Sequence, residues 1–103
     1  MAAIMLTRKT VFDEGRPLAG WEVECAGELV ATYAEEPDGG GLRLVEVSRL
    51  GRRLLACCGA YSHPALHRVL LRHALFGTVP SPAALGECYL RGAEAWEARE
   101  APR

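Results

Sequence analysis

The chain contains no asparagine and no glutamine, and eleven of its twelve basic residues are arginine. Such a bias is expected of a G+C-rich genome and is compatible with a thermophilic source, because thermolabile amides are depleted in thermophiles. No apolar run approaches the roughly 18 residues of a membrane span. The apolar residues 1–6 lack a basic n-region, and Arg8 and Lys9 follow too soon for a signal peptide. The sequence therefore predicts a cytoplasmic protein without a membrane partner.

The motifs of common catalytic and cofactor sites are also missing. The glycines at 39–41 are not followed by the Gly-Lys-Ser/Thr ending of a phosphate loop, and no serine or cysteine lies in a nucleophile elbow. The four cysteines include no Cys-x-x-Cys pair, and an intracellular chain of this size needs no disulfides, so we expect free thiols. These absences predict no cofactor and favour a protein that is not an enzyme.

The composition that remains is that of one globular domain. Half of the 103 residues are hydrophobic and 24% are charged, so we treat 1–103 as a single domain with one core. Residues 21–25 alternate between apolar and acidic side chains, which is the pattern of a half-buried strand. A tight hairpin at Ala26 and Gly27 leads into a second strand over residues 28–34.

Three further segments read as strands. Residues 4–12 and 42–50 have strand composition, but their apolar positions change parity, which predicts one bulge near residues 8–10 and another within the later strand. Residues 54–62 are apolar or small on both alternating faces and therefore predict a central strand covered on two sides. Short connections make residues from about 3 to 61 an antiparallel meander of four to five strands.

Two helices are predicted after the meander, over residues 64–76 and 82–100. The first begins at Pro64, with His63 as its N-cap, and ends near Gly77, the residue type that favours the left-handed conformation. The second begins with the same kind of signal, an N-cap residue followed by proline, here Ser81 and Pro82. The predicted fold is therefore α+β, with two C-terminal helices packed on one face of the sheet.

Charge is distributed unevenly along the chain. Residues 1–41 sum to −5, residues 42–83 to +5 and residues 84–103 to −1. Opposite charges either pair between strands of one sheet or leave a basic face for an anion or for a second copy. The candidates for anion binding are five arginines: Arg49, Arg52, Arg53, Arg68 and Arg72. We expect no nucleic-acid binding at physiological ionic strength, because acidic residues would repel a polyanion.

Cysteine and histidine supply a second set of candidates. Cys58, His63 and His67 are spaced so that a strand end and a helix start could hold zinc. Against this, His63 is the expected N-cap, and buried cysteines usually behave as small hydrophobic residues. His73 falls within the apolar face of the first helix, where a partly buried histidine with one hydrogen-bond partner is the usual outcome.

The last helix suggests a contact between subunits. Its apolar stripe includes Tyr89, Gly92 and Trp96, and glycine inside a helix indicates close approach of another backbone. The stripe could face a second copy or the sheet of its own chain. We expect a non-catalytic, self-associating interaction module, a homodimer that could also bind another protein. The alternatives are a nucleic-acid or phosphate-binding protein and a thiol- or metal-dependent enzyme.

Overall fold

A computed structural model of the protein describes residues 3–100. None of the helices within these residues is long and apolar enough to cross a membrane. The elements in chain order are β1 (Ile4–Asp13), β2 (Arg16–Cys25), β3 (Glu28–Glu35), β4 (Leu42–Val47), α1 (Arg49–Cys58), η1 (Gly59–Tyr61), α2 (Pro64–Phe76), β5 (Thr78–Val79) and α3 (Pro82–Glu100).

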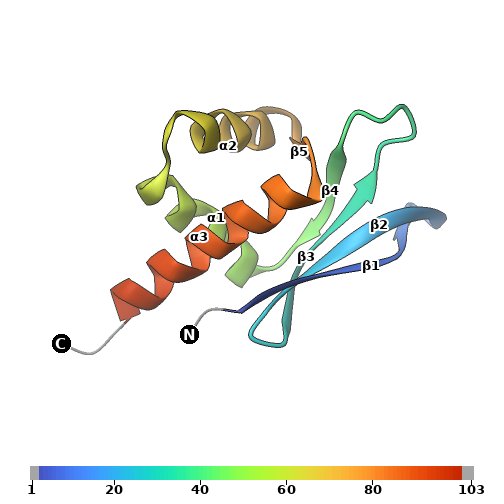
Figure 1. The fold of residues 1–103 in the computed structure, drawn as a ribbon. Coiled ribbons are helices and arrows are strands. Elements are labelled where there is room, and N and C mark those ends of the chain that lie inside the picture. The colour runs from blue at the N-terminus through green and yellow to red at the C-terminus, as the bar shows by residue number, and fades with distance from the viewer. Residues whose placement is uncertain (1–2, 101–103) are drawn as a thin grey trace.

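The strands form one antiparallel sheet in the order β1-β2-β3-β4-β5, and the helices lie on one side of it (Figure 1). The predicted α+β meander is therefore confirmed. Two tight hairpins have their central residues at positive φ, Glu14 with Gly15 and Ala26 with Gly27. That geometry twists each turn in the sense that the flanking strands need.

The helices predicted over 64–76 and 82–100 both match the structure. Gly77 ends α2 in the left-handed conformation, with φ of 68°. The Ser81 hydroxyl accepts a hydrogen bond from the backbone N–H of Ala84 at 3.1 Å and so caps α3. His63 occupies the N-cap position of α2, but its side chain makes no capping hydrogen bond.

The central strand predicted over residues 54–62 is wrong. Residues 54–61 form the end of α1 and the turn η1, so within residues 3–100 three α-helices, not two, follow β4. A short apolar run does not distinguish a strand from a buried helix by periodicity alone. The deciding features are the cap at Ser48, whose hydroxyl accepts from the Gly51 N–H, and the helical spacing of the buried Leu54 and Cys58.

The two predicted bulges have different outcomes. The pairing of β1 with β2 runs in constant register over 4–13, so the bulge predicted near residues 8–10 is wrong. The register of β3 with β4 shifts between Thr32 and Tyr33, which leaves Val45 as the extra residue, so the bulge predicted in β4 is confirmed.

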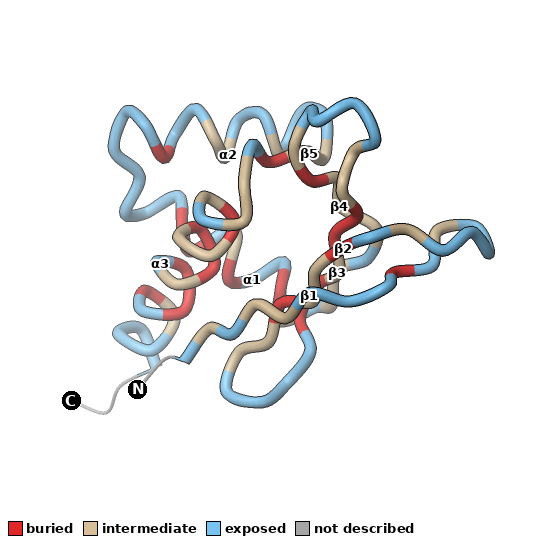
Figure 2. The backbone as a smooth tube through the Cα atoms, turned by 45° about the vertical axis from the view of Figure 1, so that its right-hand side comes forward, coloured by how far each residue is buried: buried red, intermediate tan, exposed pale blue. Residues whose placement is uncertain are grey.

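The core lies between the inner face of the sheet and the helices α1 and α3. Its largest fully buried side chains include Tyr33, Leu54, Leu85 and Tyr89. The buried segments gather where the sheet meets α1 and α3, whereas the tube of α2 is mostly exposed (Figure 2). The core therefore leaves one helix only lightly packed.

The β1–β2 hairpin curls over the outer face of the sheet, which is turned away from the helices. Val11 crosses above Gly20, where a Cβ atom would overlap both Val11 and the carbonyl oxygen of Tyr33. Past this crossing, the carboxylate of Asp13 meets the guanidinium of Arg43 in β4 at 2.6 Å. The missing side chain at Gly20 thus lets the tip of the hairpin reach a strand that is not its neighbour.

Candidate functional site

Helix α2 carries the largest group of exposed apolar side chains on any helix of the described chain. Only Leu66 of its thirteen residues is buried. Leu71, Leu75 and Phe76 are exposed to 49%, 66% and 71%. Side chains of this size usually lie in a core or an interface, so their grouping on one helix marks a candidate contact surface.

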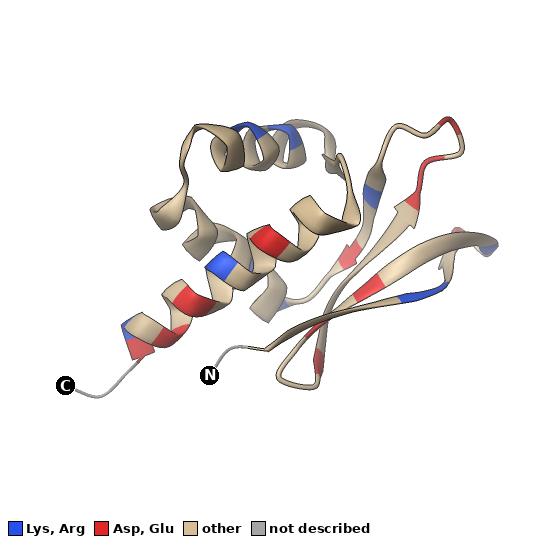
Figure 3. Cartoon of the chain, viewed as in Figure 1, with Lys and Arg blue, Asp and Glu red and all other residues tan. Residues whose placement is uncertain are grey.

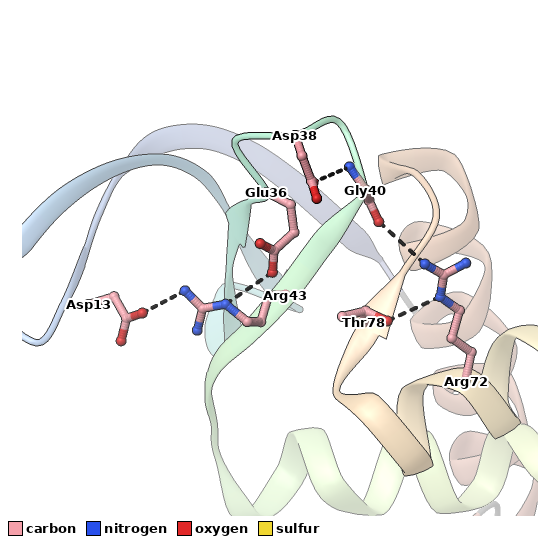
Figure 4. Close-up of polar contacts among 7 residues, drawn as sticks. All are labelled: Asp13, Glu36, Asp38, Gly40, Arg43, Arg72 and Thr78. Carbon is pink, nitrogen blue, oxygen red and sulfur yellow. Dashed lines mark hydrogen bonds and ion pairs between the residues drawn. The ribbon is translucent and has the colours of Figure 1, made fainter.

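The outer side of α2 combines this apolar surface with positive charge. A depression of about 580 Å³ is lined by Arg68, Leu71, Arg72, Leu75, Phe76 and Thr78. Figure 3 shows basic but no acidic residues on α2. The Arg72 Nε donates to the Thr78 hydroxyl at 3.1 Å, and its Nη2 donates to the Gly40 carbonyl at 3.5 Å (Figure 4). The guanidinium of Arg72 is thus hydrogen-bonded within its own chain, whereas Arg68 has no ion-pair partner within residues 3–100.

A second hollow lies on the flank of α2 that faces α1. This α1–α2 groove has a volume of about 610 Å³. Leu55 and Ala56 of α1 and Leu70 of α2 form apolar walls, and the imidazoles of His67 and His73 also line it. The groove therefore joins hydrocarbon surface to hydrogen-bonding groups, as small-molecule sites usually do.

His73 is anchored to the core by a chain of hydrogen bonds. Its Nε2 lies 2.8 Å from the hydroxyl of Tyr33, which lies 3.0 Å from the hydroxyl of Tyr89. Both tyrosines are fully buried, and their rings meet edge to face. Burial raises the pKa of Tyr33 and raises the pKa of Tyr89 to about 12, while it lowers the pKa of His73. All three side chains are therefore neutral at neutral pH.

The donor and acceptor of each of these hydrogen bonds follow from Tyr89, the buried end of the series. Within the described residues, Tyr33 is the hydrogen-bond partner of the Tyr89 hydroxyl, and we infer that Tyr89 donates to Tyr33, because the reverse direction would leave the buried Tyr89 proton without an acceptor. Tyr33 then donates to Nε2 of His73, and the ring proton of the neutral imidazole lies on Nδ1. No acceptor for this Nδ1–H exists among residues 3–100, and the atom is not sealed from solvent. His73 thus presents a free donor.

The five arginines predicted to bind an anion lie on two helices. Arg49, Arg52 and Arg53 lie on α1, and the Arg53 guanidinium stacks 5.4 Å from the centre of the Trp96 ring. Of the five, the outer depression of α2 brings together Arg68 and Arg72 and includes none from α1.

Charges also pair within the sheet. Arg43 of the basic segment binds Asp13 at 2.6 Å and Glu36 at 3.1 Å, both from the acidic segment (Figure 4). Lys9 and Glu22 form another cross-strand pair at 3.1 Å. The interpretation that opposite charges pair within the sheet therefore holds for Arg43, the basic residue of β4.

The structure does not bring the predicted zinc ligands together. Cys58 is fully buried against Cys88 and Leu66, whereas His63 and His67 are exposed. Among residues 3–100 no three His, Cys, Asp or Glu side chains are grouped so that they could hold a metal ion. The hydrogen bond to Cys58 and burial raise the pKa of Cys88, so this thiol stays protonated.

The predicted interface residues of α3 mostly face their own chain. Tyr89 is fully buried, and the backbone that closely approaches Gly92 is the Leu54 carbonyl of α1. Trp96 is half-buried and packs against the same core. The intramolecular alternative therefore describes most of this stripe, and the exposed apolar surface lies on α2 instead.

Sequence reasoning missed the outer face of α2 and the Tyr33–His73 pair. The outer face had a signal in the sequence. The leucine, valine, alanine and phenylalanine residues of α2 occupy more of the helix circumference than one packed face needs. For the pair, the expectation that His73 is partly buried with one hydrogen-bond partner is confirmed, but nothing in the sequence identified Tyr33 as that partner, because the two residues lie 40 positions apart. No protein-family model, curated protein or solved structure matches the chain.

Proposed function

We propose that the protein is a non-catalytic binding module that self-associates through the outer face of α2. The observation that carries this proposal is the exposure of Leu71, Leu75 and Phe76 on one helix that has a single buried residue. Burying such side chains is worth about 25 cal/mol per Å² of apolar area removed from water. A second copy would supply the same surface in return, as a two-fold interface requires.

The residue order along α2 suits an antiparallel pair of helices. Arg68 and Phe76 lie about 12 Å apart along the axis, since a helix rises about 1.5 Å per residue. A two-fold axis near Arg72 would set Arg68 of each copy beside Phe76 of the other. The arginine stem would then cover apolar surface, and its guanidinium would stack on the ring.

Charge does not oppose this arrangement. Arg72, the residue nearest the axis, donates to Thr78 and to Gly40 of its own chain. Its guanidinium is therefore held by hydrogen bonds within that chain. In the groove beside α2, the Ser62 hydroxyl donates to the Gly59 carbonyl at 3.0 Å.

Multi-angle light scattering at micromolar concentration tests the proposal. We expect a mass of twice the 11.2 kDa chain. Leu75→Glu should return the monomer with its circular dichroism unchanged, because Leu75 is 66% exposed. The matched control is Phe12→Glu, which adds the same charge at an equally exposed apolar residue on β1 and should leave the dimer intact.

Two results would overturn self-association through α2. One is a monomer mass for the unaltered chain throughout the micromolar range. The other is a dimer that survives Leu75→Glu. Trp96→Glu is a poor probe, because Trp96 packs against the core of its own chain and its loss would destabilise the fold.

A further inference from the structure

We propose that the α1–α2 groove binds a small amphiphilic anion, an aliphatic chain that ends in a carboxylate. The groove lies on the α1-facing flank of α2 and shares only Leu71 with the lining of the outer depression, so this proposal does not depend on self-association through the outer face. Three properties of the groove lead to it: a fixed hydrogen-bond donor, apolar walls and the absence of acidic side chains from its lining.

The fixed donor is the Nδ1–H of His73. Tyr33 holds Nε2 of the ring from inside the core, so turning the ring would break that hydrogen bond, and the Nε2–H tautomer would leave the buried Tyr89 proton without an acceptor. A carboxylate oxygen accepts strongly from such a donor, since hydrogen bonds to an ionised acceptor are about twice as strong as neutral ones. His67, on the same lining, adds a second imidazole whose ring N–H could donate to the other carboxylate oxygen.

The walls suit an aliphatic chain. Leu55, Leu70 and Leu71 offer apolar side chains, and Ala56 and Ala74 are small enough to leave the hollow open. The groove volume of about 610 Å³ lies within the roughly 300–1,000 Å³ that is usual for small-molecule pockets. No aspartate or glutamate contributes to the lining, so nothing there repels a carboxylate. The apolar walls would thus contact the aliphatic chain of the ligand, and the Nδ1–H of His73 would donate to its carboxylate.

The experiment is an NMR titration of the ¹⁵N-labelled full chain with hexanoate, octanoate, decanoate and octanol. We expect saturable shifts of the His73 imidazole and of residues along the α1–α2 groove. Each added methylene should strengthen binding by up to about fourfold. Octanol, which lacks the charge, should bind about tenfold more weakly than octanoate, which corresponds to about 1.4 kcal/mol.

Three variants test whether octanoate binds in the α1–α2 groove. Ala56→Phe places a ring in the groove from an exposed position on α1 and should abolish the saturable shifts while the fold is kept. The matched control, Ala98→Phe at an exposed position on α3, should bind octanoate as the unaltered chain does. Leu75→Glu should also bind octanoate, because it alters only the self-association face. The two proposals can therefore fail separately.

The proposal is overturned by any of four results. The first three are the absence of saturable shifts up to millimolar octanoate, octanol binding as tight as that of octanoate, and unchanged binding by Ala56→Phe. Shifts scattered over the whole surface would show detergent-like contact and would also overturn it.

Discussion

The carbonyl group of Leu54 in α1 occupies the space that a Cβ atom at Gly92 in α3 would need. Replacing Gly92 with alanine would gain about 1 kcal/mol of helix propensity but would force two helix backbones apart, and overpacking of this kind costs about 1–3 kcal/mol. We expect Gly92→Ala to lower the free energy of unfolding, measured by urea denaturation. At Gly59 a Cβ atom meets nothing within 4 Å, so Gly59→Ala should be neutral or stabilising. Equal stability of the two variants would contradict this account.

The buried position of His73 predicts a pH-dependent stability. Burial lowers its pKa in the folded chain below the ordinary value of about 6.5, so the unfolded chain binds more protons between the two values. Stability should fall as the pH decreases from about 6.5 toward the folded pKa. His73→Gln removes this titration, so the unfolding free energy of the unaltered chain relative to the variant should decrease on acidification. A constant difference between about pH 7.5 and about pH 5 would contradict the prediction, and His63→Gln, at an exposed histidine, controls for the residue type.

The start of α1 depends on one hydroxyl. Ser48 accepts a hydrogen bond from the N–H of Gly51 at 3.0 Å, and loss of such a cap typically costs about 1 kcal/mol. Ser48→Ala should therefore reduce the unfolding free energy by about that amount and speed hydrogen exchange in the first turn of α1. Ser62→Ala is the comparison, because the Ser62 hydroxyl donates to a carbonyl in an exposed turn. Unchanged exchange after Ser48→Ala would show that packing alone fixes the helix start.

The thiols should react in two groups. Cys57, Cys58 and Cys88 are buried, whereas Cys25 is half-buried and has its pKa raised by burial and by Glu97 and Glu28. We expect a thiol reagent to modify no more than Cys25 in the native chain, slowly, and all four cysteines after denaturation. Metal analysis of protein purified without chelator should find no zinc. Rapid reaction of a second native thiol, or one equivalent of zinc, would contradict a structural role for the three buried cysteines.

Local signals predicted the helices α2 and α3 but not α1, whose buried residues were predicted as a strand. Pro64 and Gly77 mark the limits of α2 because each restricts or permits one backbone conformation, whatever surrounds it. Residues 54–58 carry no such signal, and their apolar run suits a strand or a helix equally. The cap at Ser48 was the available clue, although a serine before an apolar run is common.

The candidate site was harder to predict than the fold because its groups come together only through tertiary packing. Tyr33 and His73 stand in separate elements, and neither has a neighbour in sequence that signals the pair. The arginines were visible in the sequence, yet only the arrangement of the helices determines that Arg68 and Arg72 share a surface while Arg53 stacks on Trp96. A site whose residues are distant in sequence is therefore recognised from the structure, which shows the residues in contact.

The short strand β5 covers only the first two residues of β4, at one edge of the sheet. It pairs with β4 through Thr78 and Val79 alone, and helices follow and precede it within a few residues. The opposite edge, β1, is long but carries Arg8 and Lys9, and charged side chains discourage strand addition. A partly opened molecule would thus offer poor templates at either edge, and we expect aggregates formed on heating to be amorphous, with little of the repeating strand order of amyloid.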